Sequence, residues 1–380
     1  MENYIKITDF IKQLYKKDKV ALHEPVFLGN EKNYLIDCIE STYVSYVGDY
    51  VKRFENMIKD YTESSYAVAV VNGTAGLHIS LKVLGVRPED EVITQPLTFV
   101  ASANAISHCG AYPVFVDVDI DTLGMSPESL HKFLKEHTTL KNGNLYNKNT
   151  GRRISAVVPV HIFGQPCKID KIVDICNEYG LICAEDATEA LGSWYKNKHC
   201  GTFGKVGVFS FNGNKIITTG GGGMVVTNDP EVAQRILHLT TTAKVPHPYE
   251  YIHDEVAYNY RLPNINAAIG VAQMEWFNGI LSNKRQTARL YKEFCDKGGI
   301  RFISEPDNSQ SNYWLNGIIL ENRQERDKFL NYTNSNGIQT RPIWRLMYKL
   351  EMYKDCFKID TPDAEWLEDR VVNIPSGVRV

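Results

Sequence analysis

Short apolar runs alternate with helix-like stretches from about residue 65 to residue 230, and this alternation restricts the fold more than any other feature of the chain. The apolar runs have the length of strands, and they are AVAVV (67–71), EVITQPLTF (91–99), PVFVDVD (113–119), AVVPVHIFG (156–164), LICAED (181–186), VGVFSF (206–211) and MVVTND (224–229). After the first run, Leu77, Leu81 and Leu84 recur at the spacing of one helix face. This order predicts an α/β fold in which a mostly parallel central sheet lies between helices.

The pattern changes near residue 250, where we place a domain boundary. Residues 264–297 show one long helical pattern that ends near Gly298 and Gly299. A short apolar run and a further helical stretch follow it. We therefore expect a large α/β domain in residues 1–250 and a smaller α+β domain in residues 251–380. Residues 138–152 are polar and rich in Gly and Asn, which predicts a surface excursion within the large domain.

Composition excludes several classes of protein. The formal net charge is −3, so nothing favours binding to nucleic acid or to an anionic membrane surface. The N-terminal segment is too charged for a signal peptide, and no apolar run approaches the ~20 residues that cross a bilayer. The eight cysteines form no CxxC pair. We expect free thiols in a chain that works in the reducing cytoplasm.

A turn between a predicted strand and a predicted helix, Asn72 to Ala75, is the first candidate site. A helix N-terminus offers free N–H groups and the positive end of the helix dipole, which suit a phosphate. Gly73 lets the backbone come close to a ligand, and Thr74 is a good N-cap with a free hydroxyl. The same residues also fit an ordinary strand–turn–helix with a capped helix.

Two further candidates follow predicted strands. Glu185 and Asp186 end the run LICAED, at the edge of a parallel sheet where ligands bind, although an acidic residue there can equally be a structural cap. Lys215 follows Ser210 and the strand VGVF, and four glycines come soon after it, at 220–223. Such glycines permit tight turns and close backbone approach, yet a lysine at this position can simply be solvated.

No metal site is predicted. Histidines such as His78, His108 and His253 do not show the spacing of metal ligands, and no Ser/His/Asp constellation has local support.

Taken together and in order, the segments resemble the DegT/StrS-type nucleotide-sugar aminotransferases, which are fold-type-I enzymes that use pyridoxal phosphate (PLP). The similar stretches run from about residue 22 to residue 355, and they include LHEPVFLGNE, NGTAGLH, PVHIFGQP, EDATEALGS, FSFNGNKIITTGGGG, YNYRLPNINAAIGVAQME and TRPIWRLMYKLEMYKD. The resemblance implies a fold-type-I PLP-dependent transferase with a large PLP-binding domain.

The resemblance also implies roles for single residues. Lys215 stands where the family's Schiff-base lysine stands, and Asp186 where an aspartate pairs with the pyridine nitrogen. The remaining matches are Gly73, Thr74, Ala75 and Ser210 at the cofactor phosphate, Phe99 stacked on the cofactor ring, and Asn259 at the phosphate of a neighbouring subunit. Glu189 stands where members often have Gln or His, near the cofactor's phenolic oxygen. The segment after Trp344 lacks a histidine that many relatives carry.

The implied activity is amino transfer from L-glutamate to a nucleotide-linked keto sugar in a cytoplasmic homodimer with shared active sites. The sequence around Lys215 and the segment LHEP at residues 22–25 resemble those of a subgroup that acts at C4 of UDP-linked 4-keto-6-deoxy-N-acetylhexosamines. That subgroup serves legionaminic-acid-type pathways of bacterial cell-surface sugar biosynthesis. A PLP-dependent sugar dehydratase or a C3 aminotransferase is the alternative among enzymes. A regulatory protein that keeps the fold without catalysis is the alternative from another class.

Overall fold

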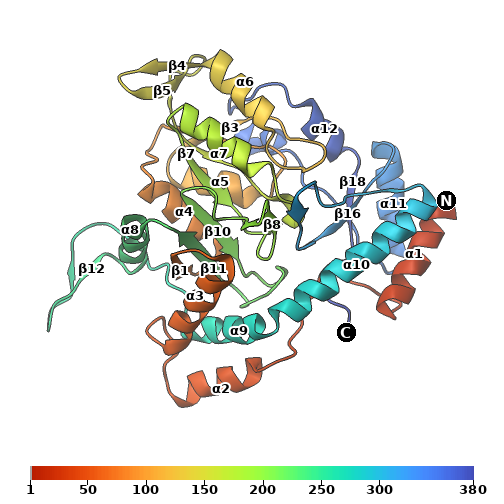
Figure 1. Cartoon of the computed structure of the whole chain (residues 1–380), viewed down its shortest axis with the longest axis horizontal. Coiled ribbons are helices and arrows are strands. Elements are labelled where there is room, and N and C mark those ends of the chain that lie inside the picture. Colours follow the sequence, from red (N-terminus) through yellow and green to blue (C-terminus); the bar gives the residue numbers. More distant parts are fainter. Residues whose placement is uncertain (1) are drawn as a thin grey trace.

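A nine-stranded mixed sheet forms the centre of the larger part of the molecule (Figure 1). The computed structural model describes residues 2–380. The main path of the sheet has the order β1-β11-β10-β7-β6-β2-β3, and the hairpin of β4 and β5 pairs with the start of β6. The strands are β1 (Tyr66–Val70), β2 (Glu91–Thr94), β3 (Tyr112–Phe115), β4 (Thr138–Lys141), β5 (Asn144–Asn147), β6 (Arg153–Val158), β7 (Ile182–Asp186), β10 (Val206–Ser210) and β11 (Gly223–Thr227).

The main path of the sheet is mostly parallel, as the sequence predicts. The strands β10, β7, β6, β2 and β3 pair in parallel with one another along this path. β11 runs antiparallel to both β1 and β10, and the sequence pattern did not predict this reversal. The reversal brings the start of β11 next to the end of β1, where the turn at Asn72 begins.

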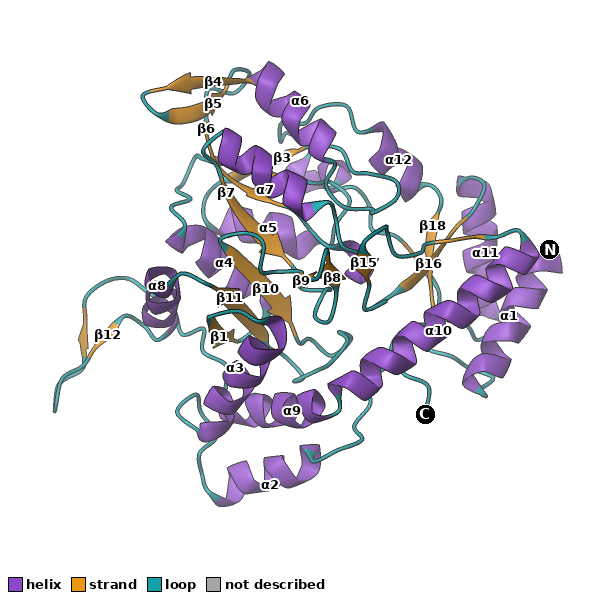
Figure 2. Cartoon of the chain, in the orientation of Figure 1, coloured by secondary structure: helices purple, strands orange, loops and turns teal. Residues whose placement is uncertain are grey.

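Helices cover both faces of the sheet because its strands are apolar on both sides (Figure 2). In β1, Val68 and Val70 join the cluster formed by α4, α5 and α8, whereas Ala69 joins the cluster on the opposite face, with α3, α6, α7 and α9. The helices of this part are α2 (Glu31–Glu40), α3 (Asp49–Thr62), α4 (Gly73–Val83), α5 (Val100–His108), α6 (Pro127–His137), α7 (Ile169–Glu178), α8 (Pro230–Thr240) and α9 (Asn264–Glu275).

A second, antiparallel sheet of four strands lies in the C-terminal part, in the order β14-β16-β18-β17. Helices α1, α10 and α11 pack on it (Figure 1). These elements are β14 (Arg301–Phe302), β16 (Asn316–Ile319), β17 (Arg341–Pro342), β18 (Val371–Ile374), α1 (Glu2–Tyr15), α10 (Phe277–Gly298) and α11 (Arg323–Ser335). The remaining elements are β8 (Trp194–Tyr195), β9 (Lys198–His199), β12 (Lys244–Val245), β13 (Ile252–His253), β15 (Ser309–Gln310), α12 (Pro362–Glu368) and the 3-10 turns at Ile162–Gly164, Met347–Lys349 and Glu351–Tyr353.

The packing of two helices bears on the predicted domain boundary, which stays a prediction. α1 lies within residues 1–250, yet its Ile7 and Ile11 pack in one cluster with Tyr291 and Phe329 of the C-terminal part. α9 lies beyond residue 250, yet it packs against α2 and α3. The N-terminal helix therefore belongs by its contacts to the C-terminal unit, and α9 belongs to the large one.

The long helical pattern of residues 264–297 forms two helices instead of one. α9 ends at Glu275 and α10 starts at Phe277, because Trp276 has a non-helical backbone (φ −106°, ψ 1°). The predicted end is confirmed, since Gly299 caps α10 with φ 66°, a left-handed conformation that glycine adopts without strain. The surface excursion at 138–152 contains the β4–β5 hairpin.

All eight cysteines are free thiols, as predicted. None of the helices in residues 2–380 combines the length and the apolar character that crossing a bilayer requires.

Candidate active site

A cavity of about 650 Å³ lies between the edge of the large sheet and the C-terminal unit. Six of the predicted site residues line the cavity, and all six belong to the larger part of the molecule: Gly73, Thr74, Phe99, Glu189, Ser210 and Lys215. The C-terminal part lines it with Trp314, Arg341, Trp344, Arg345 and Asn373, among others. Segments that lie far apart in the sequence therefore meet at one site.

The turn at the start of α4 forms one end of this cavity. Asn72, and not Thr74 as predicted, is the N-cap, because the Asn72 Oδ1 accepts a hydrogen bond from the Ala75 N–H at 2.8 Å. This cap leaves the Thr74 hydroxyl free. The N–H groups of Gly73 and Thr74 belong to the first turn of α4 and have no acceptor inside the helix. The turn therefore offers the cavity a set of donors and the positive end of a helix dipole.

Two glycines allow this turn to sit where it does. A Cβ on Gly73 would lie 2.9 Å from Thr188 Cγ2 and 3.0 Å from Ser210 Cβ. A Cβ on Gly223, the last of the four glycines, would lie 2.7 Å from the carbonyl group of Asn72. The close backbone approach that the glycine run predicts is confirmed at Gly223.

Lys215 follows β10 and brings its amine into the cavity. Its side chain is only 12% exposed, so the solvated surface lysine that the sequence left open is excluded. The Nζ atom lies 3.5 Å from Glu189 Oε1 and 4.0 Å from the centroid of the Trp314 ring. The Trp314 Nε1–H donates to the carbonyl of Asn214, the residue before the lysine, at 2.6 Å. Trp314 thus holds the backbone next to the lysine, and Glu189 and the Trp314 ring hold its amine.

Glu189 is a buried carboxyl group beside this amine. Its Oε2 accepts from the Phe163 N–H at 2.8 Å, and only 4% of the residue is exposed. Burial raises the pKa of Glu189 to about 7, although the Lys215 charge and the Phe163 N–H both act in the opposite direction. The carboxyl group can therefore exchange a proton near neutral pH.

Asp186 ends β7 and lies directly behind the cavity wall. Its Oδ2 accepts from the Ser102 hydroxyl at 2.7 Å, and its Oδ1 accepts from the Thr188 hydroxyl at 2.7 Å and from the Thr188 N–H at 3.1 Å. The residue is 2% exposed. These three donors fix the orientation of the carboxylate.

The neighbouring Glu185 has a structural role. It is fully buried, and its carboxylate accepts from the N–H groups of Gly201 and Gly204 and pairs with His161 at 3.0 Å. The Cys167 N–H donates to His161 Nδ1, so Nε2 carries the proton that reaches Glu185. Of the two acidic residues that the sequence singled out, only Asp186 contacts a residue of the cavity lining, Thr188.

Aromatic rings form the opposite wall. Phe99 lines the cavity, is 51% exposed and lies 6.3 Å from the ring of Trp344, which in turn lies 5.2 Å from Phe163. A planar ligand can stack here on an exposed aromatic face. Arg345 lines the same wall and has no hydrogen bond or ion pair with any residue in 2–380.

Asn259 does not line this cavity. It is exposed, and its backbone bridges to Thr241, at the end of α8. The structure of one chain therefore keeps Asn259 apart from Lys215, and its role in a neighbouring subunit stays a prediction. Ala75 is also absent from the cavity lining, since its N–H is bonded to Asn72.

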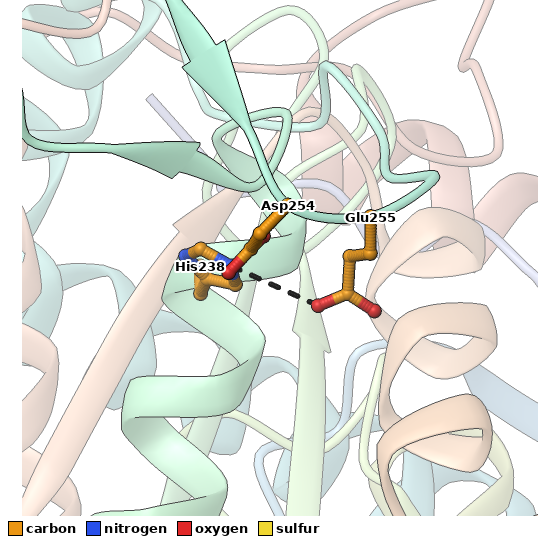
Figure 3. A group of neighbouring side chains, drawn as sticks. All are labelled: His238, Asp254 and Glu255. Atoms are coloured by element: carbon orange, nitrogen blue, oxygen red, sulfur yellow. Dashed lines mark hydrogen bonds and ion pairs between the residues drawn. The ribbon is translucent and has the colours of Figure 1, made fainter.

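His238, Asp254 and Glu255 form a cluster outside this site, where α8 meets the arm that carries β12 and β13 (Figure 3). His238 Nε2 lies 2.8 Å from Asp254 and 3.7 Å from Glu255. Both Glu255 oxygens are already hydrogen-bonded to Arg235. The hydrogen bond of His238 to Asp254 and the ion pair of Arg235 with Glu255 fasten the arm to α8.

Several cavity residues were missed by sequence reasoning. Trp314 and Asn373 carried no local signal, since nothing in their neighbourhood relates them to residue 215. Trp344 and Arg345 lie in the segment TRPIWRLMYKLEMYKD, which supported the resemblance but received no roles. Ser102 lies in SANAISHCG, where a polar residue on a buried helix face was the only signal.

The chain is similar to known aminotransferases over almost its whole length. Residues 28–380 match the model of the DegT/DnrJ/EryC1/StrS aminotransferase family. The GDP-perosamine synthase of Vibrio cholerae is 38% identical over 360 residues, which are 94% of this chain and 94% of that protein. The putative pyridoxal phosphate-dependent aminotransferase EpsN of Bacillus subtilis is 36% identical, over 94% and 91% of the two chains. The crystal structure of the aminotransferase TlmJ from Streptoalloteichus hindustanus superimposes with a TM-score of 0.85 at 26% identity, over 94% and 93%.

The family's cofactor, PLP, carries a phosphate, an aldehyde and a pyridine ring. The cavity residues fit these groups, because donors of the α4 turn, the Lys215 amine and the exposed Phe99 ring surround one space, and the buried Asp186 carboxylate lies behind its wall, bonded to the lining residue Thr188. The predicted fold and cofactor are thereby confirmed. The chain belongs to the DegT/DnrJ/EryC1/StrS aminotransferase family and is a PLP-dependent sugar aminotransferase.

Proposed function

We propose that this enzyme transfers the amino group of L-glutamate to the keto group of a nucleotide-linked sugar. The observation that carries the proposal is the environment of Lys215. Its amine lies in a cavity of about 650 Å³, next to a carboxyl group and over an indole ring, with the α4 turn at one end of the same cavity. A cavity of this size and mixed polarity suits a cofactor and a sugar together.

In this proposal the chain holds PLP through side chains of the large part. Gly73, Thr74 and Ser210 hold the phosphate, and Phe99 stacks on the ring. Asp186 keeps a proton on the ring nitrogen. The bound cofactor withdraws electrons from the substrate carbon that loses its proton. Ala75 contributes by shaping the turn, since its N–H is bonded to Asn72.

Lys215 has two tasks in this proposal. Its amine would hold the cofactor's aldehyde group in the resting enzyme, and the free amine would move a proton to and from the substrate carbon. Trp314 holds the amine in place, because the ring lies 4.0 Å from Nζ and the indole N–H binds the carbonyl of Asn214.

Glu189 adjusts the proton balance around this amine. Because burial raises the pKa of Glu189 to about 7, the carboxyl group is partly protonated at neutral pH. A protonated Glu189 can donate to an anionic oxygen, whereas a carboxylate would repel it. We therefore assign Glu189 to the cofactor's phenolic oxygen, where a shared proton removes the repulsion.

For the sugar, the sequence motifs favour C4 of a UDP-linked 4-keto-6-deoxy-N-acetylhexosamine, in a legionaminic-acid-type pathway of cell-surface sugar biosynthesis. The name of a relative, GDP-perosamine synthase, favours a GDP-linked sugar as the second candidate. The two candidates differ in the nucleotide, so they can be separated directly.

The test supplies the purified enzyme with PLP, L-glutamate and one keto sugar at a time. Mass spectrometry identifies an aminated product, and proton NMR identifies the carbon that carries the new amine. Amination of the UDP sugar at C4 supports the first candidate, and amination of only the GDP sugar replaces it with the second. If the enzyme releases no 2-oxoglutarate with any of the UDP-, GDP- and dTDP-linked keto sugars, the proposed function is contradicted.

We also propose that the active enzyme is a homodimer with shared sites. Large apolar side chains are exposed on and around α2 and α9, among them Phe27 (56%), Ile39 (67%) and Val47 (62%). The arm around β12 and β13 extends away from the body in Figure 1 and exposes Tyr249 (93%). Exposed apolar side chains in such number suit a protein–protein interface. A second copy would cover it and bring Asn259 to the partner's phosphate site.

A further inference from the structure

Lys284 is a second lysine close to the active site, and no step proposed above uses it. It lies on α10 and is 1% exposed. Its Nζ donates to the carbonyl of Trp314 at 3.1 Å and to the carbonyl of Ser376 at 2.5 Å, and it is hydrogen-bonded to His23 Nε2 at 3.0 Å. Within residues 2–380 it has no carboxylate partner at ion-pair distance. Burying an amine without a counterion costs free energy of folding. Its three hydrogen bonds offset part of this cost and hold the groups that it binds.

The three acceptors belong to three separate segments, and each segment contributes to the cavity wall. Trp314 itself lines the cavity. Ser376 follows β18, which supplies Asn373 to the wall, and His23 follows Leu22, another lining residue. The Ser376 N–H also donates to the Leu22 carbonyl at 2.7 Å. Lys284 therefore lies behind the C-terminal wall, where the N-terminal segment, the end of β18 and the Trp314 loop meet.

One of these contacts leads directly to Lys215. Lys284 binds the backbone of Trp314, and the ring of Trp314 lies 4.0 Å from the Lys215 amine. The indole N–H holds the backbone at Asn214. Without Lys284, the Trp314 carbonyl would be a buried acceptor without a donor, and the loop would have to move to reach another one.

The contact with His23 sets a tautomer. While the Lys284 amine is protonated it has no lone pair and can only donate to Nε2, so the single proton of the neutral ring is on Nδ1. The ring is neutral, since burial and the charges of Lys284 and Lys215 lower the pKa of His23 well below its usual value. Nδ1 is buried and has no hydrogen-bond partner in residues 2–380. An isolated imidazole would exchange between tautomers, whereas this one is fixed by the amine behind it.

We infer that Lys284 is a positioning residue for amino transfer: its amine joins the Trp314 loop, the end of β18 and the His23 segment, and so holds Trp314 against Lys215. This role rests on the proposed function, because it assumes that Lys215 is the group that works on the substrate. Lys284 acts through Trp314 and does not itself touch the substrate.

The test compares Lys284→Met with Lys292→Met in the full-length enzyme. Methionine keeps the length and packing of lysine but donates no hydrogen bond. Lys292 is on the same helix, is exposed and pairs with Asp296 at 2.7 Å, so it controls for the loss of a lysine from α10. Single-turnover kinetics with L-glutamate give a rate constant and an apparent donor affinity for each protein.

We expect Lys284→Met to slow the donor half-reaction about tenfold while the apparent donor affinity changes less than about twofold, because leaving one buried acceptor unpaired has an effect of this size. Lys292→Met should match the wild type. An equal loss of rate in both variants, or wild-type rates in Lys284→Met, overturns the inference.

A second measurement does not depend on catalysis or on the variant folding well. NMR of wild-type enzyme labelled with ¹⁵N-histidine, with His23 assigned through His23→Gln, reports which ring nitrogen carries the proton. Below about pH 7, where Lys284 keeps its proton, a single Nδ1–H tautomer is expected. A ring with its proton on Nε2, or exchange between both tautomers, overturns the inference. If the tautomer is as expected but wild-type enzyme aminates no keto sugar, the proposed function fails, and with it the role of Lys284 in amino transfer.

Discussion

The Ser102 hydroxyl donates a hydrogen bond of 2.7 Å to Asp186 Oδ2, and this bond joins α5 to the carboxyl end of β7. Phe99, the residue before α5, lines the cavity. One helix therefore carries both the exposed aromatic face and the donor that orients the buried carboxylate.

Asp186→Asn should keep PLP bound and slow both half-reactions by roughly a hundredfold, because an amide cannot maintain the proton on the ring nitrogen. Ser102→Ala should slow them by about tenfold, since it removes one donor to a charged acceptor and leaves the carboxylate in place. Stopped-flow single turnovers with glutamate measure both rates. Unchanged rates in Asp186→Asn would remove Asp186 from this role.

Glu189→Gln should remain active, because Gln has the size of Glu and keeps a hydrogen-bond donor. In the folded wild type the pKa of the Glu189 carboxyl is about 7, against an ordinary value of 4.5. Between these two pH values the folded state therefore holds a proton that the unfolded state has released. The free energy of unfolding should therefore fall as pH rises through this window, and the variant should lack that component. The pH midpoint of the bound cofactor's absorbance should also move. A variant that binds PLP but is inactive would contradict this assignment.

For Lys284 we expect the free energy of unfolding to change with pH in the opposite direction, and in a higher pH range. Burial lowers its pKa to about 7 from 10.5, so between these values the unfolded chain holds a proton that the folded chain has released. The free energy of unfolding of the wild type should rise with pH in this window relative to Lys284→Met. Urea unfolding of both proteins at about pH 7 and about pH 9 checks this difference, and a difference that is constant or falls with pH would refute it.

Mixing Lys215→Ala chains with Asn259→Ala chains should restore activity if the sites are shared. A hybrid dimer contains one site that has both native residues, so random mixing should recover about a quarter of the wild-type sites. The measurement is the rate of keto-sugar amination before and after subunits re-equilibrate. No gain above either parent would exclude shared sites.

Lys215→Ala should lose all steady-state turnover and still bind PLP, because the α4 turn, Ser210 and Phe99 do not depend on the lysine. Borohydride treatment followed by mass spectrometry of the denatured chain should show PLP attached to the wild type and not to the variant. Equilibrium dialysis then measures the PLP that the variant still holds. Normal turnover by Lys215→Ala would overturn the mechanism.

The sequence predicted most of the large domain because each strand and helix there has a local apolar pattern. Local patterns also placed Lys215, Ser210 and Asp186 at strand ends, which parallel strands bring to one edge. The N-cap was misassigned because Asn72 and Thr74 are both good caps, and only the backbone conformation decides between them.

The far wall of the cavity could not be predicted in the same way. Trp314 contacts Lys215 across a separation of about a hundred residues, and Lys284 reaches His23 across more than twice that distance in sequence. These contacts depend on how the C-terminal unit closes over the sheet. The packing of α1 on that unit was missed for the same reason, since periodicity identifies an apolar face but not its partner.

The close approach of Gly223 to the carbonyl of Asn72 has a practical consequence for redesigning this enzyme. No side chain fits between β11 and the α4 turn, so a library aimed at new sugars has nothing to gain at Gly73 or Gly223. Trp344, Arg345 and Asn373 stand on the other wall, and their side chains can be exchanged without moving the backbone of that turn. Randomising these three positions, with the α4 turn kept intact, is the economical route to altered acceptor preference.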